Sequence, residues 1–250
     1  TVTAVGFNFD GTAILTAAYD GTIRTWDSGT GMLRLVLDGP EDVEWAQWHS
    51  KGNAIVAGSK DGTIWMWLAH DGQCVQVFAG HEGGVSTGCF GSDGKLVCSG
   101  GDDGSVRVWA PKTGACKYVF DEKQGHDGLV TCMTSCQADA DLLLTGSVDG
   151  TVKLFQLSGK RVLQTFVHCL PVANGATLTT VQEDDDMDQQ EEEVETFSVE
   201  CVGFAIHGPR WCASGGMDST LKIWDLDVGS LRCTCTHTST VTHLLWHQTL

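Results

Sequence analysis

Histidine and aspartate side chains at suitable spacing are the first candidates for chemistry in this chain. His81 and Asp103 could act as a general acid–base pair, because a carboxylate can orient and polarise an imidazole ring. The run Gly100–Gly104 could cradle a phosphate, but no lysine stands in the Walker position. Neither a Gly-x-Ser-x-Gly elbow nor a His-Glu-x-x-His motif occurs. The sequence therefore predicts no enzyme, no catalytic residue and no cofactor-binding residue.

The eleven cysteines are the next candidates. The close pairs are Cys132 with Cys136 and Cys233 with Cys235, and neither has a second Cys or His pair at zinc spacing. Most of the cysteines stand in strand-like runs, where a thiol behaves as a small hydrophobic group. We therefore predict no metal site. A set of unpaired thiols without a secretory leader favours a cytoplasmic protein, with the nucleus as an alternative.

The charge balance restricts the class of partner. The 250 residues hold 32 acids against 15 bases, a formal charge of −17. Such a charge disfavours direct contact with nucleic acid or with an anionic membrane, and it favours a basic, Lys/Arg-rich protein segment. No apolar run reaches the roughly 18 residues that a membrane span needs, so we expect no membrane insertion.

A short signature recurs along the chain: an aspartate, a Gly or Ser, a Thr or Ser, and then an aromatic residue that closes the following strand. Its five copies begin at Asp20, Asp61, Asp103, Asp149 and Asp218 and close at Trp26, Trp67, Trp109, Phe155 and Trp224. The aspartates are 41, 42, 46 and 69 residues apart. A period of about 40–45 residues with four short strands per unit is typical of a β-propeller.

The first unit shows how these strands are separated. Alternating runs at 2–8, 13–17, 22–26 and 33–37 are divided by Asp-Gly and Gly-containing turns, which are hairpin signals. No window carries a helical period, so the fold class is all-β. Three columns align in the opening strands: valines at Val2, Val43, Val85, Val130, Val199 and Val241; polar residues at Thr3, Glu44, Ser86, Thr131, Glu200 and Thr242; aromatics at Phe7, Trp48, Phe90, Phe204 and Trp246. We expect the valines and aromatics to form the core between blades and the polar column to face the central channel.

The third unit carries a set of polar residues that resembles the WD40 family. The set is His81 after Gly80, with Ser99, Asp103 and Trp109. The resemblance implies a buried hydrogen-bonded network that locks each blade, and a satisfied polar network of this kind can specify geometry.

The other units match this set to different degrees. The fourth has His126, Thr145 and Asp149, but Phe155 stands in place of the tryptophan. The second and fifth units lack a histidine before their first strands, so we expect their locks to be incomplete.

Residues 1–250 are predicted to form a single domain of five blades, followed by the first strand of a sixth at 240–246. Because the family usually closes a ring of seven or eight blades, we expect an open, incomplete propeller. The long spacing before Asp218 is explained by an acidic insertion at about 168–197, for which we expect disorder because such a run buries little apolar area.

Acidic residues also mark the connections from one unit to the next. These connections share a face with the Asp-Gly turns, and this is the face that the WD40 resemblance implies for ligands. We predict a partner-binding site there, formed by Asp38, Glu41, Asp42, Glu82 and Asp127, with Glu44 and Glu200 facing the channel.

A Trp-rich second unit, with Trp45, Trp65 and Trp67, and the acidic insertion resemble the angio-associated migratory cell protein subgroup. This subgroup includes a yeast cytosolic chaperone of a large-subunit ribosomal protein. The resemblance implies a non-enzymatic chaperone or assembly factor in ribosome biogenesis. The alternatives are a signalling scaffold or a ubiquitin-ligase substrate receptor, although the arginine of the ligase-linked Trp-Asp-x-Arg motif is missing after Trp26 and Trp224.

Overall fold

The computed structural model describes residues 1–246 apart from 122, 170–171, 174–193, 196 and 207–209. The acidic run 183–193, for which we expected disorder, lies outside the described residues. Regular structure in the described ranges consists of β-strands, as predicted. Those ranges contain no helix of the length and apolarity that a membrane crossing requires.

Five antiparallel sheets of four strands each form the blades. Their strands are β1 (Val2–Phe7), β2 (Ala13–Ala18), β3 (Ile23–Asp27) and β4 (Leu33–Leu37); β5 (Val43–Trp48), β6 (Ala54–Ser59), β7 (Thr63–Leu68) and β8 (Cys74–Ala79); β9 (Thr87–Phe90), β10 (Val97–Gly100), β11 (Val106–Trp109) and β12 (Cys116–Phe120); β13 (Val130–Ser135), β14 (Leu142–Ser147), β15 (Thr151–Gln156) and β16 (Arg161–Val167); β19 (Val199–Phe204), β20 (Trp211–Gly216), β21 (Thr220–Asp225) and β22 (Ser230–Thr236). The short strands β17 (Val172–Ala173) and β18 (Val194–Glu195) pair with each other.

The recurring Asp-Gly-Thr signature forms the turn between the second and third strands of a blade. In the first blade, the Thr22 amide and hydroxyl donate to the Asp20 carboxylate at 3.0 and 2.6 Å. Gly21 has a φ of 78°, and a Cβ there would lie 2.9 Å from the carbonyl oxygen of Pro40. Glycine is therefore required both by its backbone conformation and by the close approach of the next connection.

The valine column forms the core between blades. Val85, Val130 and Val199 are fully buried, and Val130 packs so closely against the preceding blade that a Cβ on Gly100 would lie 2.6 Å from it. The expectation was wrong for the first unit, where Val2 and Phe7 are 63% and 64% exposed. The reason is that these columns pack toward the preceding blade, and the described chain has no blade on that side of β1.

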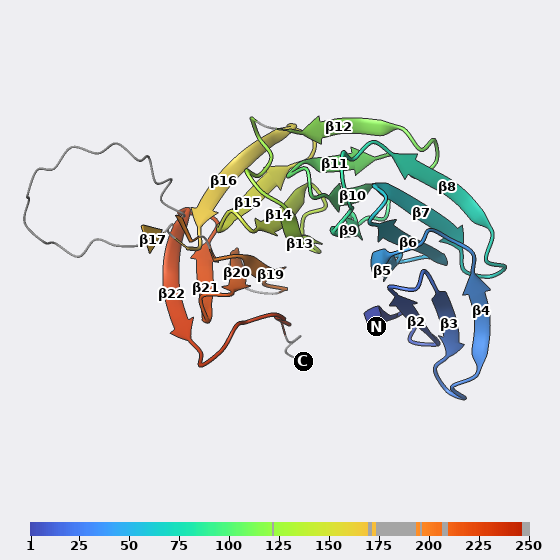
Figure 1. The fold of residues 1–250 in the computed structure, drawn as a ribbon. Coiled ribbons are helices and arrows are strands. Elements are labelled where there is room, and N and C mark those ends of the chain that lie inside the picture. Colours follow the sequence, from blue (N-terminus) through green and yellow to red (C-terminus); the bar gives the residue numbers. More distant parts are fainter. Residues whose placement is uncertain (122, 170–171, 174–193, 196, 207–209, 247–250) are drawn as a thin grey trace, which may run out of the picture.

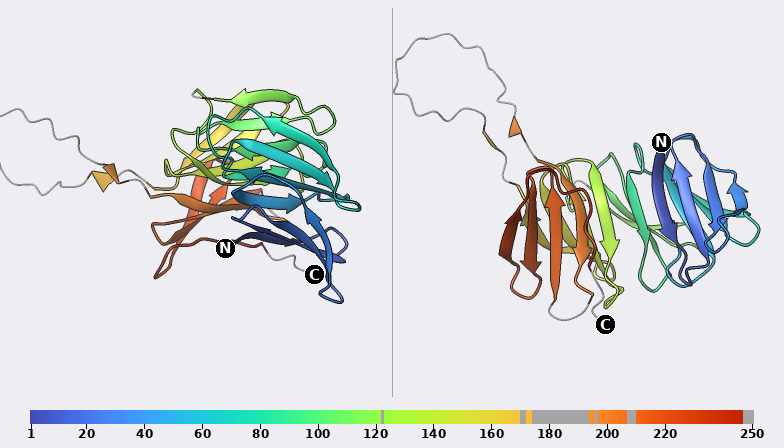
Figure 2. Two further views of the ribbon diagram at one scale, coloured as in Figure 1. Left: turned by 45° about the vertical axis from the view of Figure 1, so that its right-hand side comes forward. Right: turned by 90° about the horizontal axis from the view of Figure 1, so that it is seen from below.

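The five blades form an open arc, with β1, β5, β9, β13 and β19 on its inner side and β4, β8, β12, β16 and β22 on its outer side (Figures 1 and 2). The predicted unclosed propeller is confirmed. Residues 240–246 run beside the fifth blade, where the Val241 amide donates to the Gly216 carbonyl at 3.1 Å. They form no strand, because the described chain offers no second strand with which they could make a ladder.

Candidate functional site

A buried hydrogen-bond network holds the third blade together, as the sequence predicts. The ring of His81 lies 3.0 Å from the Asp103 carboxylate through Nδ1 and 2.7 Å from the Ser99 hydroxyl through Nε2. The indole of Trp109 donates to the same hydroxyl at 2.8 Å. These four side chains connect the loop before β9 to β10, to β11 and to the turn between these two strands. We call a network of this kind a blade lock.

The protonation of this lock follows from its burial. Desolvation lowers the pKa of His81 more than the neighbouring carboxylate raises it, which keeps the ring neutral near pH 7. Burial alone would raise the pKa of Asp103. Hydrogen bonds from the Glu82 amide and the Ser105 hydroxyl, together with the interaction with His81, outweigh burial and lower that pKa to about 2. The imidazole is neutral, and the carboxylate already accepts several hydrogen bonds. We therefore interpret His81 and Asp103 as a pair that stabilises the blade and not as an acid–base pair.

The fourth and second blades vary the network. In the fourth, His126 lies 3.0 Å from Asp149 and 2.7 Å from the Thr145 hydroxyl, whereas Phe155 offers no indole donor. The second blade has Pro40 and Ala57 at the His and Ser positions. There the indole of Trp67 donates to the carbonyl of Asp38 at 2.8 Å. The expectation of an incomplete lock therefore holds for the second blade.

For the fifth blade that expectation was wrong. His168 directly follows β16 and contacts residues that come after the insertion in the sequence. Its ring lies 2.6 Å from the Ser214 hydroxyl and 3.2 Å from the Asp218 carboxylate. Trp224 donates to Ser214 at 2.8 Å, so the lock is complete. The histidine was missed because it is the first residue of the predicted insertion at 168–197 and does not stand directly before Ser198. The available signal was a histidine two residues after the buried Phe166, close to the three residues that separate His81 from Phe78, the corresponding residue of the second blade.

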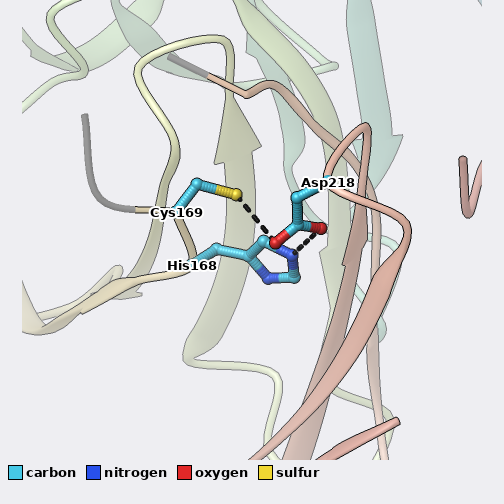
Figure 3. Close-up of side chains that lie close together, drawn as sticks. All are labelled: His168, Cys169 and Asp218. Atoms are coloured by element: carbon cyan, nitrogen blue, oxygen red, sulfur yellow. Dashed lines mark hydrogen bonds and ion pairs between the residues drawn. The ribbon is translucent and has the colours of Figure 1, made fainter. Parts of the chain in front are cut away.

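Cys169 adds a thiol to this lock. Its Sγ donates to the second oxygen of Asp218 at 3.1 Å (Figure 3). The ligand atoms of His168, Cys169 and Asp218 lie within 4.8 Å of one another, and such a set could hold a metal ion. However, both ring nitrogens are already hydrogen-bonded, and the Lys222 ammonium lies 3.6 Å from the carboxylate. Burial, followed by the bond to Asp218, raises the pKa of the thiol to about 12, so the group acts here as a protonated donor.

Five of the acids that we predicted to bind a partner lie in the connections between blades, on the face of the Asp-Gly turns. Each Asp-Gly turn contacts the connection that leads into the next blade, as Gly62 does with the carbonyl of Gly83, so turns and connections share one face. The connection acids are exposed, and we call this set the acidic rim: Asp38, Glu41, Asp42, Glu82 and Asp127. Within the described part of the chain, neither these acids nor Glu44 and Glu200 form an ion pair.

Two residues of the polar column make bonds that the sequence did not predict. The hydroxyl of Ser86 donates to the Val130 carbonyl of the next blade at 2.6 Å, and Thr131 donates in the same way to Val199. These two side chains therefore join neighbouring blades. A carboxylate cannot donate such a bond, and both Glu44 and Glu200 remain half-buried on the first strands of their blades.

Glu44 shapes its surroundings electrostatically. The hydroxyl of Tyr19, the residue after β2, donates to its carboxylate at 3.4 Å. The negative charge of Glu44 raises the pKa of Tyr19. On the inner side of the arc, nearer the opposite face, a hollow of about 620 Å³ is lined by neutral polar side chains such as Gln47 and Thr134, by apolar ones such as Trp48, and by Lys51. The described residues that line this hollow include no acidic residue.

Comparison with known proteins agrees with this architecture. The model of the WD domain, G-beta repeat, matches residues 1–27, 31–67, 72–110, 114–156 and 192–225. The human angio-associated migratory cell protein is 34% identical over 245 residues, which cover 98% of this chain and 53% of that protein. Cell division control protein 4 of Saccharomyces cerevisiae is 26% identical over 241 residues, covering 88% of this chain and 27% of that protein. The chain thus spans about half the length of the first of these relatives.

A solved structure shares the fold. The computationally designed Ika8 protein superimposes with a TM-score of 0.76 at 27% identity, covering 99% of this chain and 66% of that one. WD40 repeat proteins are in general non-catalytic platforms for protein interaction, which agrees with histidine–aspartate pairs that serve the blade locks. Five matched repeats, five four-stranded blades and three complete His-Asp pairs show that this chain belongs to the WD40 repeat family.

Proposed function

We propose that this chain is the acidic part of a protein-binding platform that holds a Lys/Arg-rich segment of a partner, as a chaperone or assembly factor for a basic ribosomal protein would. The observation that carries the proposal is the acidic rim: five exposed carboxylates on one face, without ion-pair partners in the described chain, in a protein of net charge −17. Its likeness to the angio-associated migratory cell protein supports the subgroup, and the role in ribosome biogenesis is part of the proposal.

The affinity of such a site has to come from several contacts at once. An exposed ion pair contributes only about 0–1 kcal/mol, so no single rim acid can hold a partner. Glu44 and Glu200 are half-buried on inner strands, where water screens a charge less than it does at the rim. We therefore assign the rim to steering the partner and these two glutamates to retaining it.

The compartment forms part of the same proposal. All eleven cysteines are free thiols in the structure, and several of them are buried among apolar side chains. A reducing compartment preserves such thiols. This supports a cytoplasmic site of action, with the nucleus as the alternative.

Surface plasmon resonance with an immobilised Lys/Arg-rich ribosomal-protein peptide tests the binding site. Binding should weaken steeply with salt, because the Debye length falls from about 10 Å at 0.1 M to about 3 Å at 1 M. The double variant Glu44→Gln/Glu200→Gln should dissociate about five- to tenfold faster, which corresponds to about 0.5–0.7 kcal/mol for each contact.

A matched control removes two charges from the opposite face. The variant Asp71→Asn/Asp139→Asn changes hairpin acids far from the rim and keeps an oxygen for their turn hydrogen bonds. It should bind and dissociate like the unaltered chain. Binding that is insensitive to salt, or a glutamate variant with an unchanged off-rate, would remove the acidic site and leave a generic scaffold.

A further inference from the structure

The fourth blade places a lysine where the other blades have glycine. The hairpin between the third and fourth strands needs a left-handed residue five positions after the aromatic column, and four blades use Gly31, Gly72, Gly114 and Gly229, with φ between 70° and 74°. In the fourth blade, Lys160 occupies this position with a φ of 49°. A residue with a Cβ is strained there, and strained residues that persist cluster at functional sites.

Lys160 lies at the edge of a groove between the third and fourth blades. Its ammonium is 5.3 Å from the centre of the Tyr118 ring on β12, in the neighbouring blade. The Tyr118 hydroxyl donates to the carbonyl of Leu157, which joins the two blades under the groove. The groove has a volume of about 710 Å³, and Leu96, Tyr118 and Leu157 supply its apolar surface. This volume lies within the range of about 300–1,000 Å³ that is usual for ligand sites.

The charges around this groove differ from those of the acidic rim. Lys117 and Lys160 line it, are exposed, and form no ion pair within the described ranges. The two acids of its lining are engaged: Asp93 pairs with a neighbouring lysine at 3.0 Å, and Asp141 accepts the amide and hydroxyl of a serine at 2.6 Å each. In a strongly acidic chain, the groove thus combines an apolar floor with two available cations.

We propose that this groove is a second docking site, which binds a short extended segment of a partner protein carrying acidic residues beside an aliphatic one. The aliphatic side chain would pack on Tyr118 and Leu157, and the carboxylates would contact Lys117 and Lys160. The lining comes from the start of β12 and from hairpins and loops at the face opposite the Asp-Gly turns. A partner segment here therefore leaves the acidic rim free, and both sites can be occupied together.

Fluorescence anisotropy with the full chain and a labelled peptide, acetyl-Glu-Glu-Leu-Asp-Leu-amide, tests the proposal. We expect saturable binding that weakens about three- to fivefold in Lys160→Gly and again in Lys117→Gln, as expected for exposed charge contacts. Lys112→Gln is the matched control: this lysine is exposed on a neighbouring hairpin, is not part of the groove lining, and its removal should leave binding unchanged.

The glycine variant separates binding from folding. Lys160→Gly should keep or raise the Tm, because glycine adopts this backbone conformation freely in the other four hairpins. A loss of binding in a chain that melts no earlier cannot come from unfolding. A peptide with lysines in place of its acidic residues should not compete at the groove. The proposal is overturned by the absence of saturation up to about 1 mM peptide, or by Lys160→Gly and Lys117→Gln both binding as tightly as the unaltered chain.

Discussion

Removing the carboxylate of Asp103 tests the blade lock most directly. In the structure it accepts hydrogen bonds from the His81 ring at 3.0 Å, the Glu82 amide at 3.0 Å, and the Ser105 amide and hydroxyl at 3.1 and 2.8 Å. The His81 side chain is fully buried, so Asp103→Ala leaves its ring Nδ1 out of reach of water, with only the longer contact to the Ser105 hydroxyl at 3.3 Å. The exposed Glu82 amide can be rehydrated, whereas the buried Ser105 hydroxyl keeps its contacts with the His81 ring and Arg107.

The size of the effect can be worked out in two ways. A stranded buried donor costs about 1–3 kcal/mol, and the ring N–H and the Ser105 amide are the two groups at risk. Independently, lowering the pKa of Asp103 from 3.8 to about 2 corresponds to about 2 kcal/mol of folding free energy. We therefore expect a loss of about 2–4 kcal/mol. For a domain of this size, the Tm should fall by about 4–16 °C.

The lowered pKa of Asp103 also determines how the stability of the fold depends on pH. Because the folded-state pKa lies below the unfolded one, the contribution of Asp103 is fully present above about pH 4 and is lost as the pH falls through about 2. The variant Asp103→Asn should therefore show a flatter stability curve over this acid range than the unaltered chain.

Thermal unfolding followed by circular dichroism measures both effects. The control is Asp127→Ala, an exposed rim residue whose own amide, not its side chain, donates to the fourth lock at 3.0 Å. It should stay within about 0.5 kcal/mol of the unaltered chain. Equal midpoints for Asp103→Ala and Asp127→Ala, or an acid slope that Asp103→Asn does not change, would refute the network as described.

Three further predictions concern the other blades. Replacing His168 by alanine should destabilise the fold by about 2–4 kcal/mol in thermal melts, whereas the exposed His70→Ala should change it by less than about 0.5 kcal/mol; similar losses would mean that His168 is no part of a lock. The thiol of Cys169 should react with Ellman's reagent in the native chain far more slowly than the exposed Cys74, because it is buried and its pKa is raised to about 12; comparable rates would contradict the closed lock. Trp67→Phe should cost about 1–2 kcal/mol in urea unfolding, because the indole donates to a backbone carbonyl; an unchanged midpoint would show that this bond adds nothing.

The sequence by itself determined the blade. The side chain of Asp20 accepts bonds from a residue only two positions away, and the glycine between them supplies the left-handed backbone, so the turn is fully encoded by neighbours. The strand periodicity and the all-β class follow from such local patterns. The lock of the third blade, which joins residues 22 positions apart, was implied by the resemblance to the WD40 family. The acidic rim was predictable for a similar reason, because hairpin topology alone places the connections on the face of the Asp-Gly turns.

Only the tertiary structure decided which residues complete the fifth lock and which remain available for partners. His168 meets Ser214 and Asp218 across 46 and 50 residues of chain, and no local pattern encodes a contact of that separation. Likewise, the Ser86 hydroxyl donates a hydrogen bond to the next blade and Glu44 makes no such bond within the described chain, although each residue directly follows the aligned valine of its blade. The position of Lys160 over a ring of the neighbouring blade also depends on how blades stack. Contacts between blades depend on the packing of distant segments, and that packing exists only once the arc has formed.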